Sequence, residues 1–232
     1  MKYFSIFVLI FTLLSFQKDS KIELISKTKL AVKEPSDLCL SPNQQLFMIS
    51  DNGNLYQTNL QGDIVKTSKY VGFDFEAICC DKNYIYVSEE SNRKISVFDF
   101  DLNYLKSYIL NYQGGRNKGF EAICFNEKTN NFSLISEKDP IIRRTYKKDF
   151  SAFEEVEMEG FSDVSSLTYY NDFYWVLSDE DHQVYQYNSD FELKAMFDLP
   201  VINPEGIAFL DTETVLILSD DMQVMYKFKI PQ

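Results

Sequence analysis

Acidic residues return at two fixed places along this chain. One place opens a short apolar segment with Glu or Ser, and its five residues are Ser36, Glu76, Glu121, Ser165 and Glu205. The other place follows the serine that ends the next apolar segment, and its five residues are Asp51, Glu89, Glu137, Asp179 and Asp220. Carboxylate and hydroxyl oxygens are hard ligands, and a flexible cage made only of oxygen favours Ca²⁺ over zinc or copper.

The spacing of these places predicts the fold that carries them. Successive copies are roughly 40 to 45 residues apart, which is the length of a four-stranded propeller blade. Each copy divides into four short strand-like segments; in the third copy they cover residues 121–125, 131–136, 141–146 and 153–158. The second segments are apolar on both faces and the fourth are the most polar, so polarity rises outward from an axis. We predict an all-β, five-bladed β-propeller over residues 21–232.

The two ends of the chain predict how the propeller closes. The last copy stops after its third segment, residues 223–230. Residues 23–36 match residues 192–205 without a gap, and residues 192–199 form an outer segment of the fourth copy. We therefore expect the N-terminal segment to supply the missing outer strand of the last blade and to cover its open edge.

Antiparallel pairing predicts that both sets of acids share one mouth of the central channel. The end of a second strand lies beside the start of the first, so the two places meet at one end of each blade. Carboxylates crowded on a narrow axis repel one another, and burial adds to that cost. We predict that one Ca²⁺ relieves it near Glu76, Glu121 and Glu205, with help from Asp163.

Two alternatives to a metal stay open for the acidic residues. Cationic side chains could neutralise the ring, and the candidates are Arg93, Arg116, Lys118 and Lys138, of which Lys118 and Lys138 are expected at the mouth. Alternatively, the acids of the second set could cap turns by accepting hydrogen bonds from the backbone. The single histidine, His182, is expected to be a polar turn residue, since no Ser/His/Asp triad can be assigned around it.

The net charge limits the class of partner, and the placement of the cysteines indicates their structural role. A net charge of −12 over 232 residues excludes a nucleic-acid-binding role, because phosphate contact needs a basic surface. Cys39, Cys79 and Cys124 occupy the same place in three copies and therefore lie on separate sheets. We expect them to be buried core thiols beyond disulfide range of one another, with Cys80 on the opposite face of its strand from Cys79.

Residues 1–20 carry a targeting pattern. Lys2 precedes an apolar run over residues 3–16, and polar residues follow at 17–20. This pattern predicts a cleaved signal peptide or a retained N-terminal membrane anchor, since the run is short for a spanning helix. We expect an exported protein that is periplasmic or associated with the cell membrane, and that touches the membrane only through this segment.

Five phrases of the sequence resemble the SdiA-regulated family, of the YjiK and CarP type. They cover residues 117–123, 136–140, 163–167, 177–180 and 204–208. The resemblance implies a five-bladed propeller behind an N-terminal signal or anchor, with a calcium site and a link to calcium handling. It also implies Glu121 and Glu205 as site residues, which Glu76 joins by repeat equivalence. Ala77 and Ala122 depart from the family pattern, which has glycine there.

These observations favour a binding protein over an enzyme. We expect a monomeric, calcium-binding scaffold of the cell envelope that holds an unidentified protein or small ligand at its acidic mouth. The alternative is a Ca²⁺-dependent hydrolase of the esterase, lactonase or phytase kind, in which an axial metal polarises the substrate. A third possibility is a scaffold without a metal. The sequence has no phosphate-binding glycine loop, zinc-ligand spacing or dinucleotide fingerprint.

Overall fold

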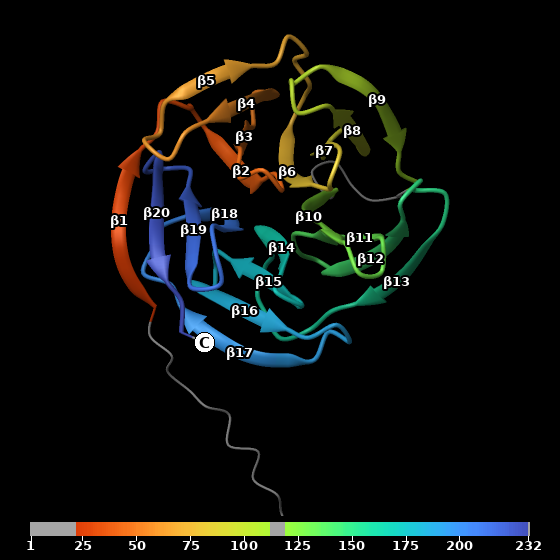
Figure 1. Ribbon diagram of the computed structural model, residues 1–232. Helices are drawn as coiled ribbons and strands as arrows, with labels where there is room; N and C mark the ends of the chain where they lie inside the picture. Colours follow the sequence, from red (N-terminus) through yellow and green to blue (C-terminus); the bar gives the residue numbers. More distant parts are fainter. Residues whose placement is uncertain (1–21, 112–118, 232) are drawn as a thin grey trace, which may run out of the picture.

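Five antiparallel sheets surround one axis in the computed structural model, which describes residues 22–111 and 119–231 (Figure 1). Blade 1 contains β2 (Pro35–Leu40), β3 (Leu46–Ser50), β4 (Asn54–Thr58) and β5 (Ile64–Thr67). Blade 2 contains β6 (Phe75–Cys80), β7 (Ile85–Glu89), β8 (Lys94–Phe98) and β9 (Tyr104–Ile109). Blade 3 contains β10 (Phe120–Asn126), β11 (Asn131–Ser136), β12 (Ile142–Lys147) and β13 (Phe153–Glu157). Blade 4 contains β14 (Ser166–Tyr170), β15 (Phe173–Ser178), β16 (Gln183–Tyr187) and β17 (Leu193–Asp198).

Blade 5 joins the two ends of the chain. It contains β18 (Pro204–Phe209), β19 (Thr214–Ser219), β20 (Val224–Lys229) and, outermost, β1 (Glu23–Lys29). β1 pairs with β20 from Glu23 opposite Lys229 to Lys29 opposite Val224. The predicted five blades and the predicted closure by the N-terminal strand are both confirmed. The pairing leaves no open edge on β20, which would otherwise present unpaired backbone groups.

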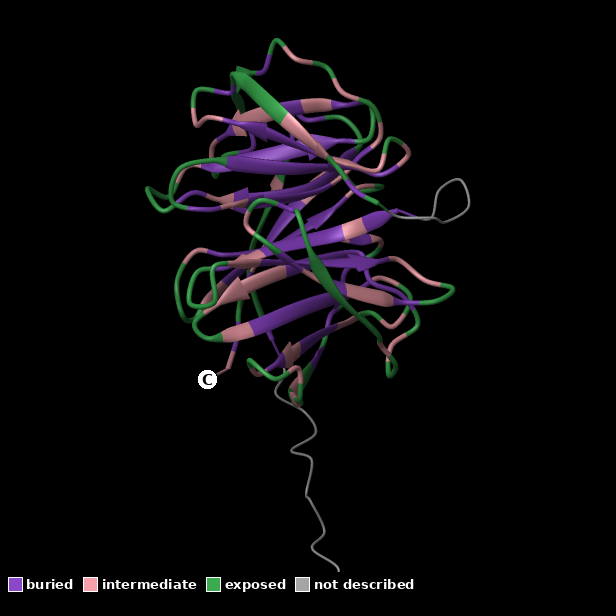
Figure 2. Ribbon diagram, turned by 90° about the vertical axis from the view of Figure 1, so that its right-hand side faces the viewer, coloured by how far each residue is buried: buried purple, intermediate pink, exposed green. Residues whose placement is uncertain are grey.

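Burial follows the position of each strand within its blade (Figure 2). Every residue of β3 and β7 is buried, whereas every residue of β5 and β13 is exposed. Hydrophobic clusters fill the spaces between adjacent blades; one of them joins Phe47 of blade 1 to Phe75 and Ile85 of blade 2. The second strands are apolar on both faces because each face meets a neighbouring blade. Among the described residues there is no helix of the length and apolar character that crossing a membrane requires.

Four inner strands carry a β-bulge at the same place. In β2, β6, β10 and β18 the register with the second strand shifts by one residue at the second position. The extra residues are Ser36, Glu76, Glu121 and Glu205. A bulge leaves one residue outside the ladder and re-aims its side chain. Four of the five residues in the first predicted set therefore owe their direction to a repeated irregularity of the backbone, and Ser165 of blade 4 is the exception.

Candidate metal-binding mouth of the propeller

A cavity of about 310 Å³ opens at the bulged ends of the inner strands. Eleven of its fourteen lining residues are acidic, and only Lys138 is basic. The lining residues are Ser36, Asp51, Asp74, Glu76, Glu90, Glu121, Glu137, Lys138, Asp163, Ser165, Asp179, Glu180, Glu205 and Asp220. The structure thus brings together every residue predicted for the mouth except Glu89 and Lys118, and Lys118 and Arg116 lie outside the described residues. We call this cavity the acidic mouth.

Serine takes the place of glutamate in two blades and connects neighbouring blades. Ser36 Oγ donates a hydrogen bond of 2.5 Å to the carbonyl oxygen of Phe75 in blade 2. Ser165 Oγ donates one of 2.7 Å to the carbonyl oxygen of Pro204 in blade 5. In the other three blades the same place holds a glutamate, so three carboxylates and two short hydroxyls surround the axis.

The prediction that Glu89 lines the mouth is wrong. Its side chain is fully buried, pairs with Lys94 Nζ at 3.1 Å and accepts a hydrogen bond of 2.5 Å from Ser96 Oγ. Matching Ser88 with the serines of the other copies placed Glu89 one residue out of register. The strand pairing sets Glu89 opposite Phe75, where the other bulged blades have a serine, and Glu90 then reaches the mouth. A shift of one residue turns a strand side chain to the other face.

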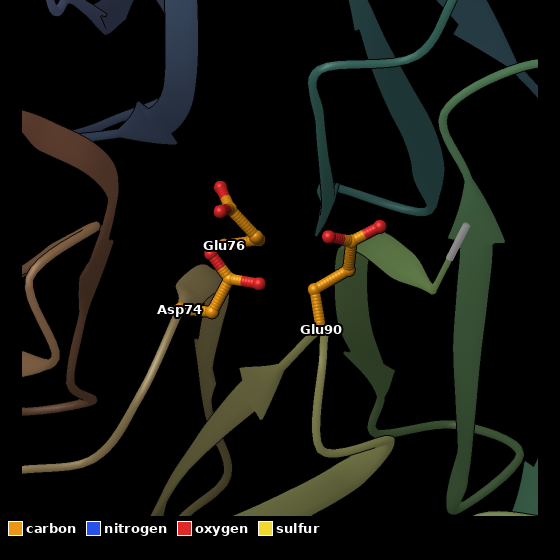
Figure 3. A group of neighbouring side chains, drawn as sticks. All are labelled: Asp74, Glu76 and Glu90. Carbon is orange, nitrogen blue, oxygen red and sulfur yellow. The ribbon is translucent and has the colours of Figure 1, made fainter. Parts of the chain in front are cut away.

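Three carboxylates converge on one side of the mouth. Oxygen atoms of Asp74, Glu76 and Glu90 all lie within 4.8 Å of one another, and the described residues contain no other such group of metal-ligating side chains (Figure 3). Asp74 Oδ2 accepts hydrogen bonds from the backbone N–H and the hydroxyl of Ser91. Glu90 Oε1 accepts one of 2.7 Å from the N–H of Gly119. Hydrogen bonds to one oxygen of Asp74 and to one oxygen of Glu90 thus hold these two carboxylates in place.

The loops around this cluster explain two features of the sequence. Asp74 has a φ of 59°, in the left-handed region that aspartate tolerates better than most residues. A Cβ on Gly119 would lie 2.5 Å from Glu90 Cγ, so only glycine lets the backbone N–H approach the carboxylate. Asp163 stands two residues before Ser165, as Asp74 stands two before Glu76. It is buried and accepts hydrogen bonds from the end of β15 and the turn that follows it, including one of 3.1 Å from the N–H of Glu180.

Burial and mutual repulsion hold the axial glutamates in their neutral form. The pKa of Glu76 is raised to about 10, first by burial and then by the charges of Asp51 and Glu121. Burial and the charge of Glu137 raise the pKa of Glu121 to about 9. Burial and the charge of Asp179 raise the pKa of Glu205 to about 8.

Lys138 neutralises only part of this charge. Its Nζ lies 2.7 Å from Glu137 and 3.1 Å from Glu180, and hydrogen bonds with these two carboxylates raise the pKa of Lys138. Both contacts are at the outer edge, since Glu137 and Glu180 follow second strands. Among the described residues no salt bridge joins a cation to Glu76, Glu121 or Glu205, and the charge of Lys138 offsets only part of the rise in the pKa of Glu121.

Asp37 closes the channel beneath the acidic mouth. It is buried and accepts hydrogen bonds of 2.8 Å from the N–H of Leu38, 2.9 Å from the N–H of Ile78 and 3.0 Å from Ser166 Oγ. These donors belong to blades 1, 2 and 4, so one carboxyl group connects three blades around the axis. A Cβ on Gly206 would lie 2.9 Å from Asp37 Oδ1, which explains the glycine at the same place in blade 5.

Sequence reasoning missed Asp74, Glu90, Glu180 and Asp37, and signals for two of them were present. Asp74 occupies the same place as Asp163, which was itself a predicted ligand. Asp37 is the only charged residue at a repeat place that otherwise holds Ala77, Ala122, Ser166 and Gly206. Glu90 was missed because Ser88 was matched with the serines of the other copies, whereas Glu180 lines the cavity beside Asp179, which was predicted.

Fold and site together define a five-bladed propeller with an acidic axial cavity. The chain belongs to the SdiA-regulated family, whose family model matches residues 16–229. This finding confirms the resemblance carried by the five sequence phrases. A comparison with curated proteins gave no match.

The fold also occurs in solved structures. A glutaminyl cyclase from Myxococcus xanthus superposes with a TM-score of 0.72 at 13% sequence identity, over 91% of this chain and 97% of that one. The virginiamycin B lyase from Staphylococcus aureus superposes with a TM-score of 0.52 at 12% identity, over 85% of this chain and 66% of that one. At such low identity the likeness concerns the fold alone.

Proposed function

We propose that the protein is an exported, calcium-binding propeller of the cell envelope that acts by binding rather than by catalysis. The observation that carries this proposal is the convergence of Asp74, Glu76 and Glu90 within 4.8 Å. Carboxylates this close repel one another unless protons, cations or a metal compensate. Oxygen-only ligands in a cavity formed by loops match the preference of Ca²⁺, which accepts six to eight oxygens in a flexible arrangement.

The site we propose lies to one side of the axis rather than at its centre. Asp74, Glu76 and Glu90 would supply charged ligands, and Glu121 is a further candidate, because its side chain interacts with Glu90 and its charge raises the pKa of Glu76. Glu205 and Asp163, which the sequence also suggested as ligands, stand outside this cluster of the described residues. In our proposal they contribute through the field of the cavity, and a bound cation would relieve the repulsion on all of them.

Calorimetric titration of the metal-free protein with Ca²⁺ and Mg²⁺ tests the proposal. We expect one Ca²⁺ per chain and weaker binding of Mg²⁺, which demands a more regular octahedral shell. Glu76→Gln and Glu90→Gln should each weaken Ca²⁺ binding by at least about tenfold, since each removes one charged ligand. Glu23→Gln, on the exposed outer strand β1, is the matched control and should bind as the wild type does. The proposal is contradicted if Ca²⁺ does not bind, or if the affinity for Ca²⁺ is unchanged in both Glu76→Gln and Glu90→Gln.

Activity assays on the same protein distinguish a binding protein from an enzyme. The raised pKa values of Glu76 and Glu121 are also those of groups that can donate a proton at neutral pH, which keeps a hydrolase worth testing. Ester, lactone and phosphoester substrates should show no turnover with or without Ca²⁺ if the protein only binds. Ca²⁺-dependent turnover that disappears in Glu121→Gln would favour the hydrolase.

A further inference from the structure

A second cavity, of about 570 Å³, opens at the end of the channel opposite to the acidic mouth. All four cysteines of the chain line it: Cys39, Cys79, Cys80 and Cys124. Leu38 also lines this cavity and Ser36 lines the acidic mouth, so Asp37 stands between the two. We call this second cavity the thiol cavity.

Two of the four thiols face each other across a blade boundary. The sulfur atoms of Cys39, on β2, and Cys80, on β6, lie 2.9 Å apart. β2 and β6 belong to different sheets, so they share no ladder of backbone hydrogen bonds. The expected separation of Cys39 from Cys79 and Cys124 does not extend to Cys80, which Cys39 meets across the blade boundary.

Strand alternation explains why the pair is Cys39 with Cys80 and not with Cys79. Cys39 packs in the cluster between blades 1 and 2, and Cys80 contacts the same cluster. Cys79 points to the other face of β6 and packs between blades 2 and 3. Cys124 packs in turn between blades 3 and 4. Cys39, Cys79 and Cys124, which stand at equivalent repeat places, thus each face the following blade. Cys80 alone faces the preceding blade, which is blade 1.

We propose that Cys39 and Cys80 form a disulfide that joins the inner strands of blades 1 and 2. A disulfide needs a sulfur–sulfur distance of about 2.05 Å, so the two sulfur atoms must approach by roughly 0.9 Å. Rotation of either side chain about its Cα–Cβ bond supplies such a movement. Cys80 is partly exposed at the cavity wall, whereas Cys39 is only 8% exposed, so an oxidant reaches Cys80 first.

The oxidant is another disulfide, which reacts by thiol–disulfide exchange. The Cys80 thiolate attacks one sulfur of that disulfide, forms a mixed disulfide and releases the first thiol. The Cys39 thiolate then attacks the Cys80 sulfur, closes the Cys39–Cys80 bond and releases the second thiol. The protein loses two electrons and two protons, and the oxidant is reduced to two thiols. Burial raises the pKa of the Cys39 thiol, which agrees with its role as the second thiol to react.

The bond would close a long loop of the chain. Residues 39 and 80 are 41 positions apart, and the segment between them contains most of blade 1. Closing a loop of this length restricts the unfolded chain and stabilises the folded one. The expected effect is an increase in Tm of about 5 to 15 °C for the oxidised over the reduced protein.

The test uses the reduced full chain treated with oxidised glutathione as the probe. Remaining thiols are alkylated under denaturing conditions, and the products are analysed by intact mass and by peptide mapping without reduction. We expect two of four cysteines to be alkylated and the peptides that contain Cys39 and Cys80 to be linked. Alkylation of all four cysteines, a linkage of Cys79 to Cys80, or glutathione retained on Cys80 would overturn the proposal.

Single substitutions provide a readout that does not depend on the linked peptide. Cys39→Ser and Cys80→Ser should each lose both the internal disulfide and the difference in Tm between oxidised and reduced protein. Cys124→Ser is the matched control; it should keep the disulfide and the difference in Tm, with one alkylated cysteine in place of two. A difference in Tm that persists in Cys39→Ser would assign it to another cause and refute the disulfide.

Discussion

The substitution Glu205→Gln isolates the electrostatic cost of the acidic mouth, because glutamine keeps the shape of glutamate and removes its charge. Burial, with the charges of Asp179 and Asp220, raises the pKa of Glu205 from 4.5 to about 8 in the folded chain. Between these two values the folded chain keeps a proton that the unfolded chain has released. The free energy of unfolding therefore falls as pH rises from about 4.5 to about 8.

The size of this effect follows from the two pKa values. One pKa unit corresponds to about 1.4 kcal/mol. At pH 7 the cost of Glu205 is therefore about 3 kcal/mol, and at pH 5 it is about 1 kcal/mol. Removing the titrating group should make Glu205→Gln more stable than the wild type by about 3 kcal/mol at pH 7, and by much less at pH 5.

Urea denaturation at pH 5 and at pH 7 measures the difference in stability between Glu205→Gln and the wild type at each pH. EDTA is present to keep the protein metal-free. Glu23→Gln on the exposed strand β1 is the control and should follow the wild type at both pH values. The reasoning fails if Glu205→Gln and the wild type keep the same difference in stability at both pH values. That result would mean that the Glu205 carboxyl titrates alike in the folded and unfolded chains.

Three further perturbations test other parts of the structure. Asp37→Ala should lower the free energy of unfolding by about 2 to 4 kcal/mol in urea denaturation, because it leaves the buried N–H groups of Leu38 and Ile78 without an acceptor; a loss equal to that of Glu23→Ala would contradict this role. Glu89→Gln should cost about 2 to 4 kcal/mol by the same measurement, since it removes the buried charge that pairs with the partly buried Lys94; a variant as stable as the wild type would show that the pair contributes nothing. Ca²⁺ at about a hundredfold its dissociation constant should add about 2.7 kcal/mol of stability, seen as a Tm raised by about 5 to 10 °C that EDTA reverses; a Tm indifferent to both reagents would favour a scaffold without a metal.

The arrangement of strands was predictable because the signals that set it are periodic. The second strand of blade 3 was predicted over residues 131–136, and β11 covers Asn131–Ser136. The match of residues 23–36 to residues 192–205 identified β1 as an outer strand before its partner was known. Repetition supports such inferences about the order of strands, since five copies carry the same pattern.

Register was harder to predict because a similar phrase can stand at a different place in the ladder. Ser50 of blade 1 lies opposite Pro35, whereas in blade 2 Ser88 lies opposite Ala77 and Glu89 lies opposite Phe75. Matching the two serines therefore assigned Glu89 to the mouth, where Glu90 lies. This error of one residue explains the one mouth residue assigned wrongly within the described chain.

Contacts between blades were the least accessible from sequence. The facing of Cys39 and Cys80 depends on which side of β6 each residue occupies and on how close two separate sheets come. Repeat equivalence compared Cys39 with Cys79 and Cys124 and did not consider Cys80, because it compares positions along the chain and not faces across a boundary. The same limit hid the hydrogen bond from Ser166 to Asp37, two residues 129 positions apart.

The two serines of the axial ring argue that its glutamates are not there for the fold. Ser36 and Ser165 stand at the same place as Glu76, Glu121 and Glu205, and each bonds directly to the next blade. A neutral residue is thus compatible with this position and stabilises the blade boundary, whereas each glutamate there is held against its preferred ionised state by burial and by other carboxylates. If folding alone determined these positions, serine would serve in all five blades. The costly carboxyl groups at three of them are what a cation site requires, and they support the binding role proposed for the mouth.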